Sequence, residues 1–378
     1  MMQFSGCCRF IWNKALALQK ERLDAGDRCQ SYNSLALLLP SWKKEFPFLN
    51  DAPSQALQQV LRNLDRAIKD GFDKKQPEKR FPTFKKKSIA TDSFRYPQGF
   101  KIVGKRIFLP KLGWISFNKS RNVEGTAKNV TVSRKGANWF ISIQTEMEVA
   151  EPHHPSGTLV GIDRGIKQFA VLSDGTFYEP LNAFRTLEAK LAREQQRLAR
   201  KIKKSKNWFK QKSRITRLHI RIADMRNDYL HKLSTAISKN HAAVVLEALK
   251  VKNMSASAKG TIELPGRKVL QKAGLNKAIL DQGWGNFRLY LEYKQIRRGG
   301  MVIYVNPAYT SQRCSCCGHT HPANRKNQSE FLCQACGLAL NADFNAAINI
   351  SRAGHAQLAC QATGAVIPAA TGTSRHAA

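Results

Sequence analysis

The spacing of apolar residues changes character along the chain. Between residues 5 and 74, apolar side chains recur at intervals of three and four positions, which is typical of amphipathic helices. Between residues 100 and 149, apolar and polar side chains alternate in short runs separated by glycines, which predicts strands. We therefore expect a helical domain over residues 1–74 and a small β-barrel or β-sandwich domain over residues 75–152.

A third pattern begins near residue 157, where short apolar strands alternate with longer helical stretches. A hairpin comes first, two long amphipathic helices follow at about 183–204 and 213–239, and two more strands flank a further helix. This alternation predicts an α/β domain, to which we assign residues 157–352. The tail over residues 353–378 is rich in Ala, Gly and Thr and nearly uncharged, and we expect it to be disordered.

The charge of the chain indicates a polyanionic partner. Its 378 residues include 62 Lys and Arg against 27 Asp and Glu, for a formal net charge of +35. The excess positive charges repel one another, and a folded chain tolerates this repulsion best when a polyanion neutralises them. Nucleic acid is the first candidate for that polyanion. The hydrophobic content of 42% excludes a disordered basic protein, and no apolar run approaches the ~18–20 residues that span a bilayer. Charge alone favours a ribosome-binding protein as much as a nuclease.

Two basic segments are candidate nucleic-acid interfaces. Residues 74–87 hold seven Lys or Arg and one Glu, interleaved with Phe81 and Phe84, a mixture that suits stacked bases and phosphates. Residues 200–221 hold ten Lys or Arg and no acid. The alternatives are a linker whose phenylalanines dock onto the core, and a solvated helix face. The predicted contacts to nucleic acid are Lys85, Lys86, Lys87, Lys201, Lys203, Lys204, Lys206, Lys210, Lys212, Arg214, Arg217 and Arg221.

Four of the nine cysteines follow the spacing of a zinc site. In their C-x2-C-x15-C-x2-C pattern each C-x-x-C pair can form a tight knuckle, and Gly318 and Gly337 allow the backbone to turn. The remaining cysteines, including Cys316 inside the first knuckle, show no disulfide framework, and no secretory leader is expected, which favours a reducing cytoplasm. The predicted ligands of one structural Zn²⁺ are Cys314, Cys317, Cys333 and Cys336.

Three acidic residues stand at the ends of predicted elements. Asp163 ends the first strand of the α/β domain, Glu247 ends a later strand, and Asp343 opens the helix after the cysteines. Because strand ends lie side by side in an open sheet, these acids can converge despite their separation in sequence. Converging carboxylates favour Mg²⁺ or Mn²⁺, and two such ions can support hydrolysis of a phosphodiester. Taken singly, the three could be a turn residue, a surface charge and a helix N-cap.

Several local motifs of the chain recur together in one known protein family. They are Gly161–Lys167, Leu246–Leu249 with Asn253 and Met254, Gly283–Gly285, Leu291–Lys294, Tyr309–Gln312 and Asn341–Ala347. With these motifs the chain resembles the TnpB proteins of bacterial insertion sequences, long named OrfB transposases and related to the type V CRISPR effectors. The resemblance covers nearly the whole chain up to about Arg352.

The resemblance implies a RuvC-type, ribonuclease-H-like nuclease. Its zinc-binding target-DNA lobe would be inserted at residues 307–340, with a β-barrel wedge domain and a helical recognition domain before it. It also implies a guide RNA derived from the transposon end, double-stranded target DNA, and a bacterial protein associated with the nucleoid. Asp163, Glu247 and Asp343 match the catalytic triad of the family, and the four cysteines match its zinc ligands.

The chain departs from the family pattern at its beginning. Family members usually carry a strand and a helix before the stretch that resembles Gly6–Asn13, so the chain is expected to be N-terminally shortened. A missing strand would leave an unpaired edge in the wedge domain. Three functions stay open: an RNA-guided DNA endonuclease, a nuclease-inactive RNA-guided DNA-binding repressor, and an accessory or strand-joining transposition protein.

Overall fold

The computed structural model describes residues 1–87 and 92–363, with side chains through residue 360. Within it the chain divides into two compact units, Met1–Val149 and a second that begins at Ala150. Each unit has its own hydrophobic core.

The first unit opens with the predicted helices. Residues 54–72 form a strongly amphipathic helix because Leu57, Leu61, Leu64 and Ile68 recur on one face, and all four are buried. The helices are α1 (Met2–Asp24), α2 (Tyr32–Leu37), α3 (Leu39–Glu45) and α4 (Ser54–Phe72), with a 3₁₀ turn at Pro47–Asp51.

Strands complete the first unit as two antiparallel sheets, and both predicted classes of element are confirmed. One sheet has the order β1-β5-β6 and the other β2-β3-β4. Apolar side chains of β1, β3 and β5 join the cluster that the helices bury, so helices and strands share one core. The strands are β1 (Ser93–Tyr96), β2 (Lys101–Val103), β3 (Arg106–Leu109), β4 (Gly113–Ser116), β5 (Thr126–Lys135) and β6 (Asn138–Glu146).

A five-stranded mixed sheet with the order β11-β10-β7-β8-β9 forms the centre of the second unit. Strands β7, β10 and β11 are parallel, whereas β8 and β9 return antiparallel from β7. The parallel strands therefore all end at the same edge of the sheet. Their bounds are β7 (Leu159–Asp163), β8 (Ala170–Leu172), β9 (Phe177–Tyr178), β10 (Ala243–Glu247) and β11 (Met301–Val305).

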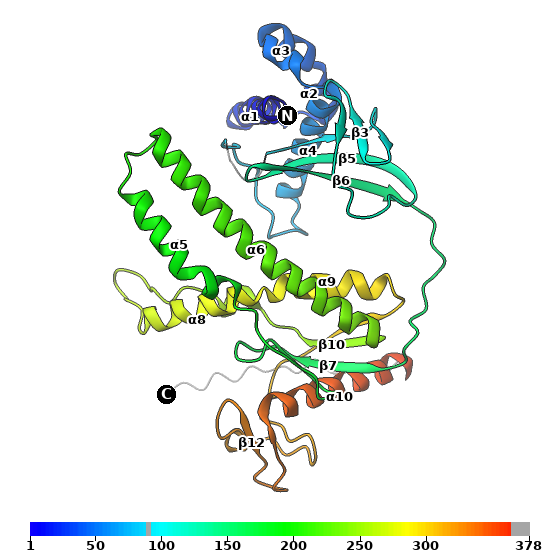
Figure 1. Ribbon diagram of the computed structural model, residues 1–378, viewed down its shortest axis with the longest axis vertical. Coiled ribbons are helices and arrows are strands. Elements are labelled where there is room, and N and C mark those ends of the chain that lie inside the picture. Colours follow the sequence, from blue (N-terminus) through cyan, green and yellow to red (C-terminus); the bar gives the residue numbers. More distant parts are fainter. Residues whose placement is uncertain (88–91, 364–378) are drawn as a thin grey trace. The chain divides into compact units, whose positions relative to one another are not determined.

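Helices cover both faces of this sheet (Figure 1). Val244 and Leu246 of β10 pack against α6 and α9 on one face, while Ala243 and Val245 face α10 on the other. This alternation follows from the two-residue period of a strand. The helices of this unit are α5 (Ala183–Ala199), α6 (Lys206–Asn240), α7 (Val251–Met254), α8 (Val269–Gln282), α9 (Trp284–Ile296) and α10 (Ala342–Thr363).

Three predicted boundaries are wrong. The first long helix, α5, ends at Ala199 rather than near residue 204. The second long helix, α6, begins at Lys206 rather than near residue 213, because the Ser205 side chain accepts a hydrogen bond from the Trp208 backbone N–H (3.1 Å) and caps it. The predicted disordered tail is helical from residue 353 to 363, within α10. Leu358 there packs against the sheet, and Gly354 lies so close to Val245 that a side chain would clash. Residues 364–378 lie outside the described part of the chain.

None of the helices in the described residues is both long enough and apolar enough to cross a membrane.

Gly161 gives a direct test of how α10 packs on β7. A Cβ at this position would lie 2.8 Å from the Ser351 Cα and would also clash with the backbone of Ala347, both on α10. We expect Gly161→Ala to lower the free energy of unfolding by about 1–3 kcal/mol, because the helix must move off the sheet. Gly157→Ala, where a Cβ has open space, is the matched control. Equal stability of both variants in urea unfolding would contradict this packing.

Candidate active site and metal centre

Two carboxylates lie at the shared end of neighbouring parallel strands. Leu246 of β10 pairs with Ile162 of β7, so the next residue on each strand, Glu247 and Asp163, reaches the same sheet edge. Glu247 is only 8% exposed. The side chains of these strands are apolar on both faces of the sheet, because helices cover both faces. The two acids are the last residues of their strands.

Asp343 reaches the same region from the first turn of α10. The Asn341 side chain caps this helix by accepting hydrogen bonds from the backbone N–H groups of Asp343 (3.0 Å) and Phe344 (3.1 Å). The alternative that Asp343 is itself the N-cap is therefore wrong. The Asp343 carboxylate does not cap the helix, and its charge acts on Asp163.

The three carboxylates are close enough to repel one another. Burial raises the pKa of Asp163 from 3.8 to about 7, and the charges of Glu247 and Asp343 add to this shift. Burial also raises the pKa of Glu247 and of Asp343. Their oxygens are nevertheless spread more widely than the four sulfurs: in the described residues, only the cysteines bring three or more such donors within 4.8 Å of one another.

Two arginines that spacing alone did not single out lie beside these acids. Arg325 forms an ion pair with Asp343 (3.2 Å) and lowers the pKa of both Asp343 and Asp163. Arg164 is 7% exposed and donates a hydrogen bond to the backbone carbonyl of Glu247 (2.6 Å). Both cations partly offset the negative charge of the site.

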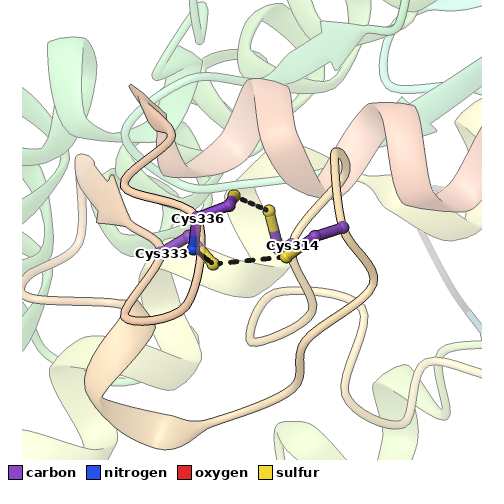
Figure 2. A group of neighbouring side chains, drawn as sticks. Cys314, Cys333 and Cys336 are labelled. Carbon is purple, nitrogen blue, oxygen red and sulfur yellow. Dashed lines mark hydrogen bonds between the residues drawn. The ribbon is translucent and has the colours of Figure 1, made fainter.

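The four cysteines converge from two knuckles (Figure 2). Their sulfurs lie 3.7 Å apart for Cys314 and Cys336, and 3.6 Å apart for Cys317 and Cys333. Gly318 and Gly337 adopt φ values of 77° and 70°, which confirms the predicted turns. This donor set fits tetrahedral zinc.

Backbone hydrogen bonds prepare Cys333 to bind metal as a thiolate. The N–H groups of Cys336 and Ala335 both donate to the Cys333 sulfur at 3.4 Å, and they lower the pKa of this thiol to about 6. Strands β12 (Glu330–Leu332) and β13 (Ala339–Asn341) pair within the lobe and lead into α10. Cys316 is exposed.

The basic residues of segment 200–221 lie on a helical hairpin formed by α5 and the first half of α6. The two helices pack through a buried apolar cluster formed by Leu191, Ile215 and Leu218. At its base, Asp281 accepts hydrogen bonds from the Phe184 backbone N–H (3.0 Å) and from Arg226 (2.6 Å). The predicted contact residues on it are all exposed, namely Lys201, Lys203, Lys204, Lys206, Lys210, Lys212, Arg214, Arg217 and Arg221.

The other basic segment is docked on α1 of the first unit. The Trp12 indole N–H donates to the Thr83 carbonyl (3.1 Å). The Asn13 side-chain amide donates to the Lys85 carbonyl (3.0 Å) and accepts from the Lys85 backbone N–H (2.8 Å). The Lys85 ammonium lies 3.6 Å from the Trp12 ring centroid, a cation–π contact. Lys86 and Lys87 are exposed. Of the two phenylalanines, Phe81 packs against the core of the first unit, whereas Phe84 is 48% exposed. The docked-linker alternative therefore holds for Phe81 and not for Phe84.

Burial of Asp163, reinforced by the negative charges of Glu247 and Asp343, predicts an unusual stability effect. Because the folded-state pKa of Asp163 (about 7) exceeds its ordinary 3.8, its contribution to stability is fully present below about pH 4 and is lost as pH rises through 7. Without Mg²⁺ at pH 8, we expect Asp163→Asn to raise the free energy of unfolding by about 1–3 kcal/mol, since one pKa unit corresponds to ~1.4 kcal/mol. The gain should vanish near pH 4. A less stable variant at pH 8 would contradict the repulsion.

The cysteine cluster predicts selective loss of metal. We expect Cys333→Ser to lose its zinc and to expose the lobe to proteolysis, because structural zinc contributes ~10–16 kcal/mol of apparent binding energy in small sites. Cys316→Ser, one residue from a ligand, is the control and should keep one zinc per chain by elemental analysis. Full zinc content in Cys333→Ser would refute the ligand assignment.

Comparisons with known proteins agree with this organisation. The OrfB_IS605 family model, described as "Probable transposase", matches residues 142–258, a "Cas12f1-like, TNB domain" model matches residues 284–350, and a "Helix-turn-helix domain" model matches residues 1–28. The solved structure of a Cas12f1–sgRNA–target DNA complex aligns with a TM-score of 0.53 and 16% identity, over 93% of this chain and 81% of that one. This likeness shows a shared multidomain α/β fold.

Curated relatives show the family. The Escherichia coli K12 protein named "Putative RNA-guided DNA endonuclease InsQ" is 55% identical over 95% of this chain and 90% of its own length. A Streptomyces pristinaespiralis protein of the same designation is 32% identical over 94% of this chain and 85% of its own. The chain therefore belongs to the TnpB, or OrfB, family of insertion-sequence proteins.

Proposed function

We propose that this protein is a transposon-encoded, RNA-guided DNA endonuclease. The observation that carries the proposal is the meeting of Asp163 and Glu247 at one edge of the sheet, within electrostatic reach of Asp343 on α10. Two relatives from the same family are named as putative RNA-guided DNA endonucleases. The sheet order and its covering helices support a RuvC-type, ribonuclease-H-like nuclease domain.

The donor set fits hard divalent cations. Carboxylate oxygens alone are the ligands that Mg²⁺ and Mn²⁺ prefer, and three buried or half-buried carboxylates need positive charge to stay ionised together. Mg²⁺, when bound, would activate water and stabilise the leaving oxygen of a phosphodiester. Two such ions are expected, because one can activate the attacking water while the other stabilises the leaving oxygen.

The residues of this chain prepare the site for an anionic substrate. Arg325 has 28% of its side chain exposed, so it can exchange Asp343 for a phosphate oxygen once divalent cations neutralise the carboxylates. Lys167 also lowers the pKa of Asp343 and adds positive charge beside it. Together they would hold the scissile phosphate near the three acids.

The basic surfaces would bind the guide RNA and the target DNA. Long cationic side chains on the α5–α6 hairpin suit the phosphate backbone of an RNA–DNA duplex, with base pairing left to read the sequence. In this proposal the zinc lobe at residues 307–340 contacts target DNA. Residues 1–74 and 75–152 serve as recognition and wedge domains, and the guide derives from the transposon end.

The test separates cutting from binding. Protein purified with its own RNA, whose sequence is read to define the target, should cut matched duplex DNA in Mg²⁺. Asp343→Ala should cut at least about a thousandfold more slowly while retaining DNA within about threefold, because it removes only groups used in the reaction. Asp228→Ala, an exposed acid on α6, is the control.

Other results would favour other functions. Equal DNA retention with no cutting by the wild type would replace the nuclease with a guided repressor. Joined transposon ends made by the purified protein alone would favour a strand-joining transposase.

A further inference from the structure

A hydroxyl from the first residues of the zinc lobe (residues 307–340) contacts the Glu247 carboxylate. The Thr310 Oγ1 lies 2.6 Å from the Glu247 Oε1 and 3.1 Å from the Pro307 carbonyl oxygen. A threonine hydroxyl has one hydrogen to donate, and the shorter distance is to the carboxylate, as expected for a charge-assisted hydrogen bond.

Local backbone geometry directs Thr310 toward the site. Tyr309, immediately before it, has a φ of 63°, which is rare for a residue with a side chain and turns the chain sharply. The Tyr309 carbonyl accepts hydrogen bonds from the N–H groups of Gln312 and Arg313, both at 3.0 Å. These bonds close the turn and fix the direction of the Thr310 side chain.

Buried amides of α10 fasten the same segment. Asn349 is 7% exposed, and its amide donates to the carbonyls of Thr310 (3.0 Å) and Arg313 (2.7 Å). Asn345, fully buried, donates to the Arg313 carbonyl (2.8 Å) and accepts from the Ser315 N–H (2.9 Å). The helix that carries Asp343 therefore also sets the position of the hydroxyl on Glu247.

We propose that Thr310 is a positioning residue for Glu247 and that Asn349 acts through it; the proposal rests on the carboxylate site of the proposed function. The terminal torsion of a glutamate side chain is broad, so a hydrogen bond to one oxygen selects one orientation of the carboxylate plane. With Oε1 fixed by Thr310 and the backbone carbonyl fixed by Arg164, Glu247 presents Oε2 in a defined direction. Outer partners of this kind strengthen ion binding by pre-ordering a ligand.

Binding of Mn²⁺ by the 378-residue chain, measured calorimetrically without RNA or DNA, tests this directly. We expect Thr310→Val, which keeps the shape but removes the hydroxyl, to weaken Mn²⁺ affinity about 10–100-fold, with a similar fall in cleavage rate. Thr310→Ser keeps the hydroxyl and should stay within about threefold of the wild type for both. Thr320→Val, at an exposed threonine of the lobe, should change neither.

A double-mutant cycle tests the role of Asn349. If Asn349→Ala acts through Thr310, it should weaken Mn²⁺ binding in the wild type but add little to the Thr310→Val variant. Additive effects of the two substitutions would overturn that link.

The outcomes distinguish this inference from the proposed function. Wild-type Mn²⁺ affinity in Thr310→Val, or an equal loss in Thr310→Ser, would overturn the positioning role while leaving the metal site intact. If the wild type bound Mn²⁺ no more tightly than Asp163→Asn, the metal site itself would fail, and the positioning role with it.

Discussion

The fold of the second unit brings acidic side chains together, and their negative charges repel one another in the folded state. Parallel strands β7 and β10 must end at the same edge, and each ends in an acid, so folding brings Asp163 and Glu247 together. Helix α10, which packs on one face of this sheet, carries Asp343 in its first turn. Burial raises the pKa of Asp163, and the charges of Glu247 and Asp343 raise it further, so this arrangement costs free energy when all three acids are ionised. Such a cost is retained where an ion or a phosphate is to be bound.

Helix α10 links the two metal-related features of the chain. Its first turn carries Asp343, its buried Asn345 and Asn349 fasten the segment before the first knuckle, and its length covers the sheet face that includes Val245. The zinc lobe supplies Arg325, which forms an ion pair with Asp343, and Thr310, which contacts Glu247. Through these two residues the zinc lobe forms part of the carboxylate site.

The sequence alone could predict the features that depend on local pattern. Apolar runs ending in Asp163 and Glu247 indicated strand ends, and the two C-x-x-C pairs with their following glycines indicated the knuckles, which the structure confirms. The contribution of Arg325 could not be predicted, because one cation among 62 Lys and Arg carries no local signal. Thr310 lies 63 residues from Glu247 in sequence, and only the turn at Tyr309 and the amides of α10 bring the two together. The end of α10 was missed because Ala and Gly usually indicate a loose tail, whereas Gly354 here permits close packing on Val245.

Anomalous X-ray diffraction from crystals of the protein grown with Mn²⁺ tests the central claim most directly. The account predicts Mn²⁺ peaks bound by side-chain oxygens of Asp163, Glu247 and Asp343, with Arg325 displaced from Asp343. Mn²⁺ found only elsewhere on the protein, with the three carboxylates bound to no shared ion, would contradict it.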